Sequence, residues 1–283
     1  MKMNNIKRKK FFQRIFLLYL PVLIVIVFVL LPFVYALSLS FKTQRDVMLG
    51  DVSFIPLHFT LGNYVNTWVS NKFGTYFLNS LVLSAVSVVV ILILTLANGY
   101  VLSRYKFKGK GVFTLLLLAT QMMPVCLIIT PLFLIFKNMH LINSLASVAI
   151  CFIVLQAPFN TILMRSFMNN INKGIDEAAM VDGAGKFTII FKIVTPIVLP
   201  GIVATSAFAF VGCWNEFLIP FSFLQDATKF TLPVGLKYMI GEYTVDYPSL
   251  AAGSVIALIP PILLFAFIQK YLISGLSGGA VKG

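Results

Sequence analysis

Charged residues are scarce in this chain, and acidic ones are scarcer still. Only 11% of the 283 residues are charged, with 22 Lys and Arg against 9 Asp and Glu, whereas about 25% are charged in a soluble domain. Because 59% of the residues are hydrophobic, too little polar surface remains to cover a soluble globule. The composition excludes a soluble protein and indicates that lipid is the main solvent.

Cysteine and histidine are also rare, and their scarcity excludes several kinds of chemistry. Cys126, Cys151 and Cys213 lie in separate apolar runs, so neither a disulfide framework nor a metal-ligand spacing is visible. We expect them to be small buried hydrophobic residues. His58 and His140 leave little basis for a histidine-based metal or acid–base site. No H-E-x-x-H or G-x-S-x-G sequence occurs, which argues against an intramembrane enzyme.

Long uncharged stretches dominate the chain. Spanning the hydrocarbon core takes about 20 apolar residues as a helix, because unpaired backbone groups are costly in lipid. We therefore predict an all-α integral membrane protein with six transmembrane helices, over residues 15–41, 73–103, 111–136, 138–164, 193–215 and 247–269. The first stretch follows basic residues, as in a signal peptide. It is longer than the roughly 7–15 apolar residues of such a peptide, which favours an uncleaved helix.

The basic residues are unevenly distributed between the loops. Lys and Arg are retained on the cytoplasmic side of a membrane. With the N-terminus inside, the inner segments hold 16 of the 22 basic residues: six before residue 15, four in 104–110, four in 165–192 and two after 269. The outer loops hold the other six together with five acids. The positive charge is thus a topology signal rather than a nucleic-acid-binding surface, and both termini are expected to be cytoplasmic.

Two outer segments are longer than a simple turn, at residues 42–72 and about 222–250. Both could meet an external partner. For the first segment, capping of the helix ends is an equally good interpretation. No repeat of fixed period, Gly/Ser linker or separable soluble domain is visible, so we predict a single membrane domain.

An inner loop over residues 165–195 interrupts otherwise short connections. From Asp176 its sequence is a good helix former with acids in the first turn, where the helix dipole favours them. Gly183 offers the left-handed conformation that ends a helix. Beyond it, apolar residues recur at helical spacing towards Pro196 and Pro200, which suit the opening turns of another helix. The loop is predicted to be a short helix, a sharp turn and a second helical element, suited to insertion into a cleft of a soluble partner.

This loop resembles that of a known family. Glu177-Ala178-Ala179, Asp182-Gly183-Ala184, Ile193, Pro196 and Pro200 closely resemble the EAA loop of binding-protein-dependent ABC permeases. Weaker matches resemble the six-helix G-type subunit of the maltose-type carbohydrate permeases; they are Asn79-Ser80-Leu81, residues 100–107, Gln121 with Pro124, Trp214-Asn215-Glu216-Phe217 and residues 279–283. One departure is Thr195, where that family usually has Leu.

The resemblance implies a division of labour between subunits in a bacterial plasma (inner) membrane. This chain would pair with a second homologous permease as a heterodimer, two cytoplasmic ATPase subunits and an external sugar-binding protein, which residues 222–250 would contact. The coupling residues would be Glu177, Ala178, Ala179, Asp182 and Gly183, and a tail with Lys282 and Gly283 would also reach the ATPase. ATP and Mg would be bound there, and no cofactor by this chain.

The sequence independently argues for a partner ATPase. It has no G-x-x-x-x-G-K-[ST] phosphate loop, so this chain is expected to be a pathway subunit and not an enzyme. The expected organisation is a basic N-terminus (1–14), a transmembrane domain (15–273) with a permease core (72–273) and the EAA loop (165–195), and a cytoplasmic tail (274–283).

Polar residues within membrane helices are the candidates for a substrate path, because they usually face the protein interior or water. Amide and carboxylate groups suit sugar hydroxyls, and aromatic rings suit the apolar face of a sugar ring. The candidates are Asn79, Gln121, Gln156, Asn160, Asn215 and Glu216. An amide can equally bond a neighbouring helix, and Glu216 can be a structural, hydrogen-bonded group.

Three functions remain in competition. The resemblance favours an ATP-driven importer of a sugar, and an oligosaccharide in particular, although the residues leave other small solutes open. An ion-coupled secondary transporter would place ionisable residues at the membrane midplane. Glu216 is the only acid near a membrane run and lies towards its end, which disfavours this alternative. An intramembrane enzyme has the least support.

Overall fold

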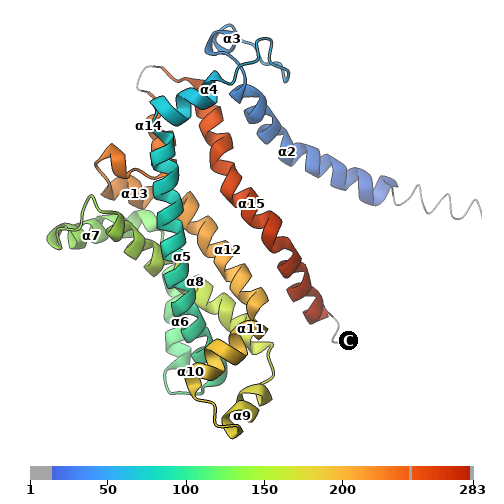
Figure 1. Cartoon of the computed structure of the whole chain (residues 1–283), viewed down its shortest axis with the longest axis vertical. Coiled ribbons are helices and arrows are strands. Elements are labelled where there is room, and N and C mark those ends of the chain that lie inside the picture. Colours follow the sequence, from blue (N-terminus) through green and yellow to red (C-terminus); the bar gives the residue numbers. More distant parts are fainter. Residues whose placement is uncertain (1–14, 242–243, 281–283) are drawn as a thin grey trace, which may run out of the picture. The chain divides into compact units, whose positions relative to one another are not determined.

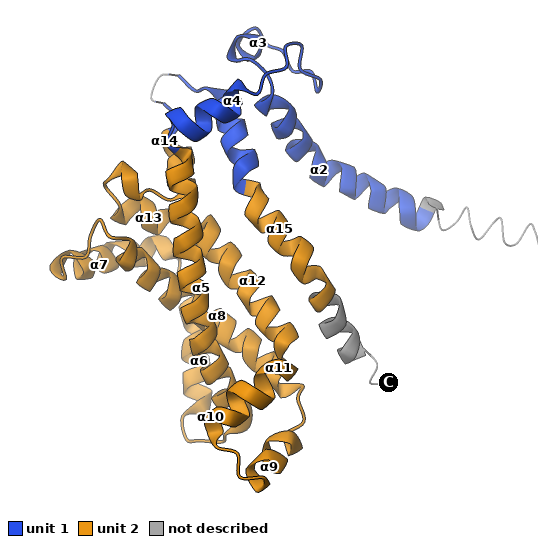
Figure 2. Cartoon of the chain, in the orientation of Figure 1, with its two compact units in different colours: residues 1–72, 239–257 blue, residues 73–238, 258–283 orange. Residues whose placement is uncertain are grey.

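The computed structural model describes residues 15–241 and 244–280, and the regular elements of that part of the chain are helices (Figure 1). They fall into two compact units, which Figure 2 colours separately. The first unit holds the described residues up to Lys72 together with Met239–Ala257. The second holds Phe73–Tyr238 and the described residues from Leu258 onwards.

Within the described residues, four helices are long and apolar enough to cross a membrane on their own. They are Leu17–Ser40, Phe73–Arg104, Leu145–Asn169 and Tyr247–Tyr271. Figure 1 labels them α2 (Leu20–Ser40, after the π-helical turn Ile15–Tyr19), α5 (Phe73–Arg104), α8 (Leu145–Asn169) and α15 (Tyr247–Ala280). Two further spans are bent pairs of helices, and six spans result when each pair is counted once. The predicted all-α membrane fold is confirmed.

The third predicted span is broken by a proline. It consists of α6 (Lys110–Gln121) and α7 (Val125–Asn138), which are bent by 100°. Pro124 disfavours helical backbone in Met123 before it and cannot donate an N–H to the preceding turn. Its own backbone is extended, with ψ of 129°. The prediction of one continuous helix over residues 111–136 is therefore wrong.

The fifth predicted span is also bent, at a place that the sequence marks. Lys186–Ile197 and α12 (Leu199–Asn215) meet at 83° around Val198. Pro196 and Pro200 lie in the first turns of α11 (Thr195–Ile197) and α12. Their predicted role as residues that open helices is confirmed, because a missing N–H costs nothing in a first turn.

The fourth predicted span, 138–164, is shifted along the chain. α8 begins at Leu145, where the Ser144 hydroxyl accepts a hydrogen bond from the Ala146 N–H at 3.2 Å. The residues before it form a connection in which His140 and Asn143 have positive φ values of 56° and 58°. A lack of charge made this connection indistinguishable from the helix that follows.

One cysteine is not where we expected it. Cys151 and Cys213 are buried, as predicted, but Cys126 is exposed. Cys126 lies in the first turn of α7, directly after the break at Pro124. The side chains on both sides of this break are largely exposed, so the expectation of a buried thiol is wrong there.

The core of the second unit lies between α5, α8 and α12, which pack together. Small residues allow the close approach. A Cβ on Gly99 of α5 would lie 2.8 Å from Met164 Cγ, and one on Gly201 of α12 would lie 2.7 Å from the Phe167 side chain. Close packing of this kind is the main attraction between helices in lipid, where there is no hydrophobic driving force.

Three short helices follow α12, and the Asn143 side chain holds the segment between the first two of them. The helices are α13 (Leu218–Phe223), the 3-10 turn Ala227–Lys229 and α14 (Leu232–Tyr238). Asn143 Oδ1 accepts hydrogen bonds from the N–H groups of Gln225 and Asp226, both at 3.1 Å. Asn143 Nδ2 donates to Asp226 Oδ2 at 2.8 Å. The segment is thereby fixed to the residues before α8.

In the first unit, the chain from Lys42 to Lys72 folds on itself around a buried ion pair. It contains α3 (Gln44–Met48), α4 (Gly62–Val65) and the π-helical turn Asn66–Ser70. Lys42 is 0% exposed, and its Nζ lies 3.0 Å from Asp51 Oδ2 and donates to the Asp51 carbonyl at 2.9 Å. Asn63 Nδ2 caps the end of α2 by donating to the carbonyls of Ser40 and Lys42, each at 2.8 Å.

Candidate coupling site

The predicted loop helix is present as α9 (Gly174–Val181), with Asp176 and Glu177 in its first turn. Gly183 follows with a φ of 81°, and its N–H bonds the Met180 carbonyl at 3.1 Å. An L-residue rarely adopts this conformation, so glycine suits the end of the helix. The predicted short helix and its glycine stop are confirmed. α10 (Lys186–Thr188) and the π-helical turn Ile189–Val194 come next.

A buried arginine anchors α9 to the membrane helices. Arg104, the last residue of α5, donates from Nε to Asp176 Oδ2 in the first turn of α9. Its Nη1 donates to the carbonyls of Met168, at 3.1 Å, and Ile171, at 3.2 Å. Both side chains of the ion pair are only 6% exposed. One guanidinium therefore joins α5, the end of α8 and α9, as its planar array of donors allows.

An apolar cluster fixes the same helix from a second direction. Ala179 of α9 is buried together with Tyr100 of α5 and Met164 of α8. The other buried members are Leu96, Met168, Ile189, Val194 and Val198. The close approach that the small Ala179 side chain permits is thus to this chain's own helices, whereas Ala178 is exposed.

The remaining side of α9 and the start of α10 form an exposed face. We call this the coupling face and define it by Glu177, Ala178, Met180, Val181 and Phe187, all of them exposed. Val181 and Phe187 are 87% and 80% exposed, which is unusual for large apolar side chains in water. Asp182 and Gly183 are exposed beside it. The face combines apolar side chains with carboxylates, and the opposite side of α9 is buried against the membrane helices.

Four of the residues predicted for coupling are exposed, namely Glu177, Ala178, Asp182 and Gly183, whereas the fifth, Ala179, is buried. The sequence analysis did not point to Met180, Val181 or Phe187, and it missed the anchor. Arg104 and Asp176 lie 72 positions apart, and no local pattern links them. Their only signal is that Arg104 ends a long apolar run and that Asp176 lies in the first turn of a predicted helix. The predicted tail residues Lys282 and Gly283 lie outside the described residues.

Two of the predicted substrate-path residues bond to backbone groups of this chain. Asn79 Nδ2 donates to the carbonyls of Thr228, at 2.9 Å, and Phe230, at 3.0 Å. Glu216 Oε1 accepts from the N–H groups of Leu218, at 3.0 Å, and Ile219, at 3.3 Å, at the start of α13. These bonds satisfy backbone groups that a loop or helix start leaves unpaired.

Three other candidates gather along α8. Gln121 Nε2 donates to the Leu155 carbonyl at 3.4 Å, and Asn160 Nδ2 donates to the Gln156 carbonyl at 2.8 Å. Gln156 also lies against Gly212 of α12, where an added Cβ would be 2.2 Å from Nε2. Asn160 is completely buried, so its amide faces protein in this structure. The sixth candidate, Asn215, is exposed at the end of α12.

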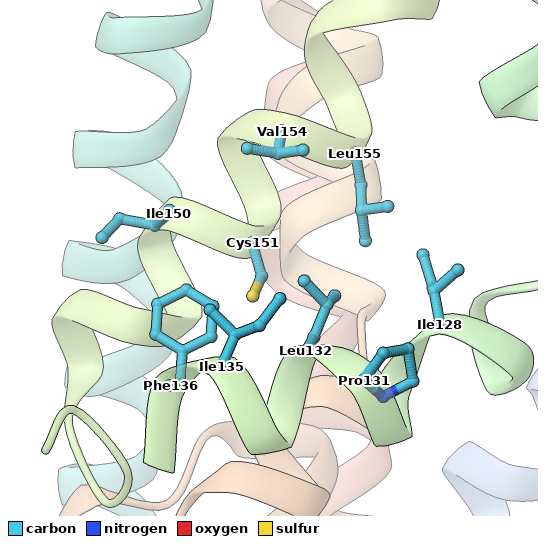
Figure 3. A pocket seen from close by; sticks show the side chains of 9 residues that line it. All are labelled: Ile128, Pro131, Leu132, Ile135, Phe136, Ile150, Cys151, Val154 and Leu155. Atoms are coloured by element: carbon cyan, nitrogen blue, oxygen red, sulfur yellow. The ribbon is translucent and has the colours of Figure 1, made fainter. Parts of the chain in front are cut away.

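An apolar cavity of about 270 Å³ lies between α7 and α8 (Figure 3). It is lined by Ile128, Pro131, Leu132, Ile135, Phe136, Ile150, Cys151, Val154 and Leu155. None of the six polar candidates is among them. A sugar requires hydrogen-bonding partners for its hydroxyl groups, so this cavity is not suited to a saccharide.

The fold and the coupling face define a class of protein: polytopic membrane proteins with a short, anchored helix outside the spans. The chain belongs to the family described as "Binding-protein-dependent transport system inner membrane component", which matches residues 95–278. The predicted family and the inner-membrane location are confirmed. The family is one of transport components, not of enzymes.

Individual relatives cover nearly the whole chain. It is 34% identical over 255 residues to the arabinooligosaccharides transport system permease protein AraQ of Halalkalibacterium halodurans, covering 89% of this chain and 91% of AraQ. It is 30% identical to the diacetylchitobiose uptake system permease protein NgcG of Streptomyces coelicolor, over 90% and 85%. A chain of a bacterial ABC transporter involved in the import of the acidic polysaccharide alginate matches at 25% identity and a TM-score of 0.77, over 92% of this chain and 97% of that one.

Proposed function

We propose that this chain is a pathway subunit of an ATP-driven importer and that the cargo is a saccharide, with an oligosaccharide favoured. The family assignment supports the importer. The names of the relatives, which refer to arabinooligosaccharides, diacetylchitobiose and alginate, support the cargo. The relatives are similar to this chain along most of its length, so the likeness includes the membrane spans as well as the EAA loop.

The observation that carries the mechanism is the anchoring of α9. A helix of eight residues is too short to be stable alone, yet Arg104 and the apolar cluster hold it against α5 and α8. The coupling face on its other side would dock in a groove of a cytoplasmic ATPase subunit. Val181 and Phe187 would supply apolar contact, and Glu177 would pair with a basic residue of the ATPase.

The assembly would contain a second homologous permease, two ATPase subunits that bind ATP and Mg, and an external binding protein. Lys282 and Gly283 are proposed to contact the ATPase, and residues 222–250 the binding protein. The bonds from Asn143 and Asn79 support the second proposal, because they hold part of that segment in one conformation. The distribution of Lys and Arg supports cytoplasmic termini.

The substrate path is proposed to pass the polar groups of α6, α8 and α12. Among the candidate amides, Gln121 and Asn215 are exposed, and Asn79 and Gln156 are half-buried. Asn160, which is completely buried, would take part only if a change between conformations exposed its amide. Alternating access requires such a change.

Substitution of the coupling face tests the proposal. Glu177→Lys and Val181→Asp should abolish both saccharide uptake and co-purification of the ATPase, since the first reverses a charge at the contact and the second places a carboxylate in its apolar part. Lys137→Gln, an exposed change at the end of α7, is the matched control and should leave both unchanged. Full uptake and ATPase binding in the two variants would refute docking through this face.

The energy source and the cargo require separate measurements. Uptake should continue when a proton uncoupler is added and ATP is maintained, and its loss would favour the ion-coupled alternative. A thermal-shift screen of the cognate binding protein against saccharides should give its largest stabilisation with an oligosaccharide, because a ligand stabilises the folded state that binds it.

A further inference from the structure

A group of basic side chains lies where α5, α6 and α8 adjoin, and it extends to the residue that precedes α9. It comprises Lys106, Lys108, Lys110, Arg165 and Lys173, and we call it the basic cluster. Lys110 lies within electrostatic range of Lys106, Arg165 and Lys173. The backbone places them together, because α6 starts directly after the short connection from α5 and packs against α8.

Hydrogen bonds tie the centre of the basic cluster together. Arg165 Nη1 of α8 contacts Thr114 Oγ1 of α6 at 3.4 Å, and Thr114 Oγ1 donates to the Lys110 carbonyl at 2.9 Å. Lys110 Nζ donates to the Tyr105 carbonyl at 3.1 Å. Arg165 and Lys110 are therefore held in place rather than free to move apart in solvent.

No acidic side chain in the part of the chain that the structure describes forms an ion pair with the basic cluster. The ion pairs found among the described residues are Lys42–Asp51, His58–Asp46, Arg104–Asp176 and Lys229–Asp226, and none of these includes a residue of the cluster. The Nε of Arg165 is buried without a hydrogen-bond partner. Because buried donors are normally satisfied, this group calls for an acceptor from outside the chain.

The backbone at the start of α6 adds to the attraction for an anion. Gly109, with a φ of 89°, precedes the helix, and no side chain caps it. The first turn contains no acidic residue, and a Cβ added to Gly109 or Gly111 would have no neighbouring atom within 4 Å. The unpaired N–H groups and the helix dipole therefore favour a negative group at the same place as the cations.

The surface next to the cations is apolar. Val112, Phe113, Leu115 and Leu116 of α6 are all exposed, Leu115 by 65%. Exposed Tyr105 and Phe107 flank the lysines, as aromatic residues do where helices leave the hydrocarbon. A ligand that fills this surface needs an anionic head and an adjoining hydrocarbon chain. An acidic protein segment would match the cations but not the apolar strip.

We propose that the basic cluster binds the phosphate headgroup of an anionic phospholipid, with an acyl chain lying along the exposed apolar side of α6. Arg165 and Lys110 hold the phosphate, while Lys106 and Lys108 strengthen the attraction from the adjoining loop. Basic pockets between membrane helices bind anionic lipid headgroups in this way. The site is separate from the coupling face and from the polar candidates on α8.

Native mass spectrometry of the full-length chain can test the site. The purified chain is mixed with equal amounts of phosphatidylglycerol and phosphatidylcholine that carry the same acyl chains, and bound lipids are counted. Phosphatidylglycerol should bind in preference, and each charge removed in Lys110→Gln and Arg165→Gln should weaken its binding about fivefold. Lys72→Gln with Lys237→Gln removes two exposed charges elsewhere and should have no effect.

Two further arms distinguish the alternatives. Excess inorganic phosphate should not displace the lipid, because it lacks the acyl chain. Lys106→Gln with Lys108→Gln changes only exposed loop residues, so it should weaken lipid binding without risk to folding. The proposal would be overturned if both lipids bound equally or if the Lys72 and Lys237 control lost as much binding. It would also be overturned if phosphate displaced the lipid, or if the basic-cluster variants affected only ATPase binding.

Discussion

Arg104 and Asp176 form a buried ion pair that joins the last residue of α5 to the first turn of α9. The pair is supported by two backbone carbonyls from the end of α8. A buried charge without its partner is costly, so both charges must be kept together. The pair therefore fixes the placement of α9 against α5. Of the contacts that hold the coupling face, this is the one that a single substitution can most directly remove.

Arg104→Gln should destabilise the chain by about 3–5 kcal/mol, because it leaves the Asp176 carboxylate buried without its partner. We expect a lower midpoint of thermal unfolding in detergent and faster hydrogen exchange in α9. Adding Asp176→Asn to Arg104→Gln should recover part of the loss, since the buried charge is then gone. Arg45→Gln, an exposed change, is the control. Additive effects of the two substitutions would contradict direct pairing.

Gly99→Ala should destabilise the contact between α5 and α8 by about 1–3 kcal/mol, the usual cost of overpacking. The added methyl would meet Met164 Cγ at 2.8 Å and the Arg165 backbone nitrogen at 3.2 Å, and a backbone atom cannot easily shift. Gly111→Ala is the matched control, because nothing lies within 4 Å of its Cβ. The midpoints of thermal unfolding of the two variants should be compared. Equal midpoints would argue against close packing at Gly99.

Asn143→Gly should release the segment around Gln225 and Asp226 while preserving the left-handed backbone at residue 143, where φ is 58°. The side chain's bonds to these two residues are largely exposed, so the loss should be about 1–2 kcal/mol in total. Hydrogen exchange should rise at residues 224–229 and stay unchanged in α9. Unchanged exchange at residues 224–229 would show that other contacts hold the segment.

Asp51 should titrate well below the usual range for an aspartate. Hydrogen bonds from Ser53, followed by the bond and charge of Lys42, lower its pKa from 3.8 to about 2. Because the pKa is depressed by folding, the stabilisation is fully present above pH 3.8 and is lost as the pH falls towards 2. Ser53→Ala should move the pKa upwards in a carbon-13 titration of the labelled full-length chain. An unaltered pKa in that variant would rule out the Ser53 hydroxyl as the main cause, because the Ser53 N–H bond to Asp51 Oδ1 is retained.

Local features of this structure could be read from the sequence, because their causes are local. Gly183 ends α9 since few other residues adopt its backbone conformation, and Pro196 and Pro200 open helices since they lack an N–H. The spans were visible because lipid tolerates few charges. Glu177 and Ala178 of the coupling face followed from the EAA pattern, whereas its apolar residues did not, and Ala179 lies in the core.

The rest depends on contacts between distant parts of the chain. Pro124 breaks its span by 100° while Pro158 lies within a continuous α8, and the two prolines have similarly apolar surroundings in the sequence. Only packing against neighbouring helices separates these outcomes. Likewise, Arg104 could have paired with any inner acid, and the backbone groups that Asn79 and Glu216 bond are brought beside them only by the fold.

The attachment of α9 to α5 has a mechanical consequence. α5 is a continuous helix of 32 residues, which at 1.5 Å per residue makes a rod of about 48 Å. A tilt of about 5° imposed at the Arg104 end would displace the Phe73 end by about 4 Å over that length. Because α5 is unbroken, a displacement of α9 would be transmitted along the whole length of that helix. The bends at Pro124 and Val198 would be the places where neighbouring segments change their angle.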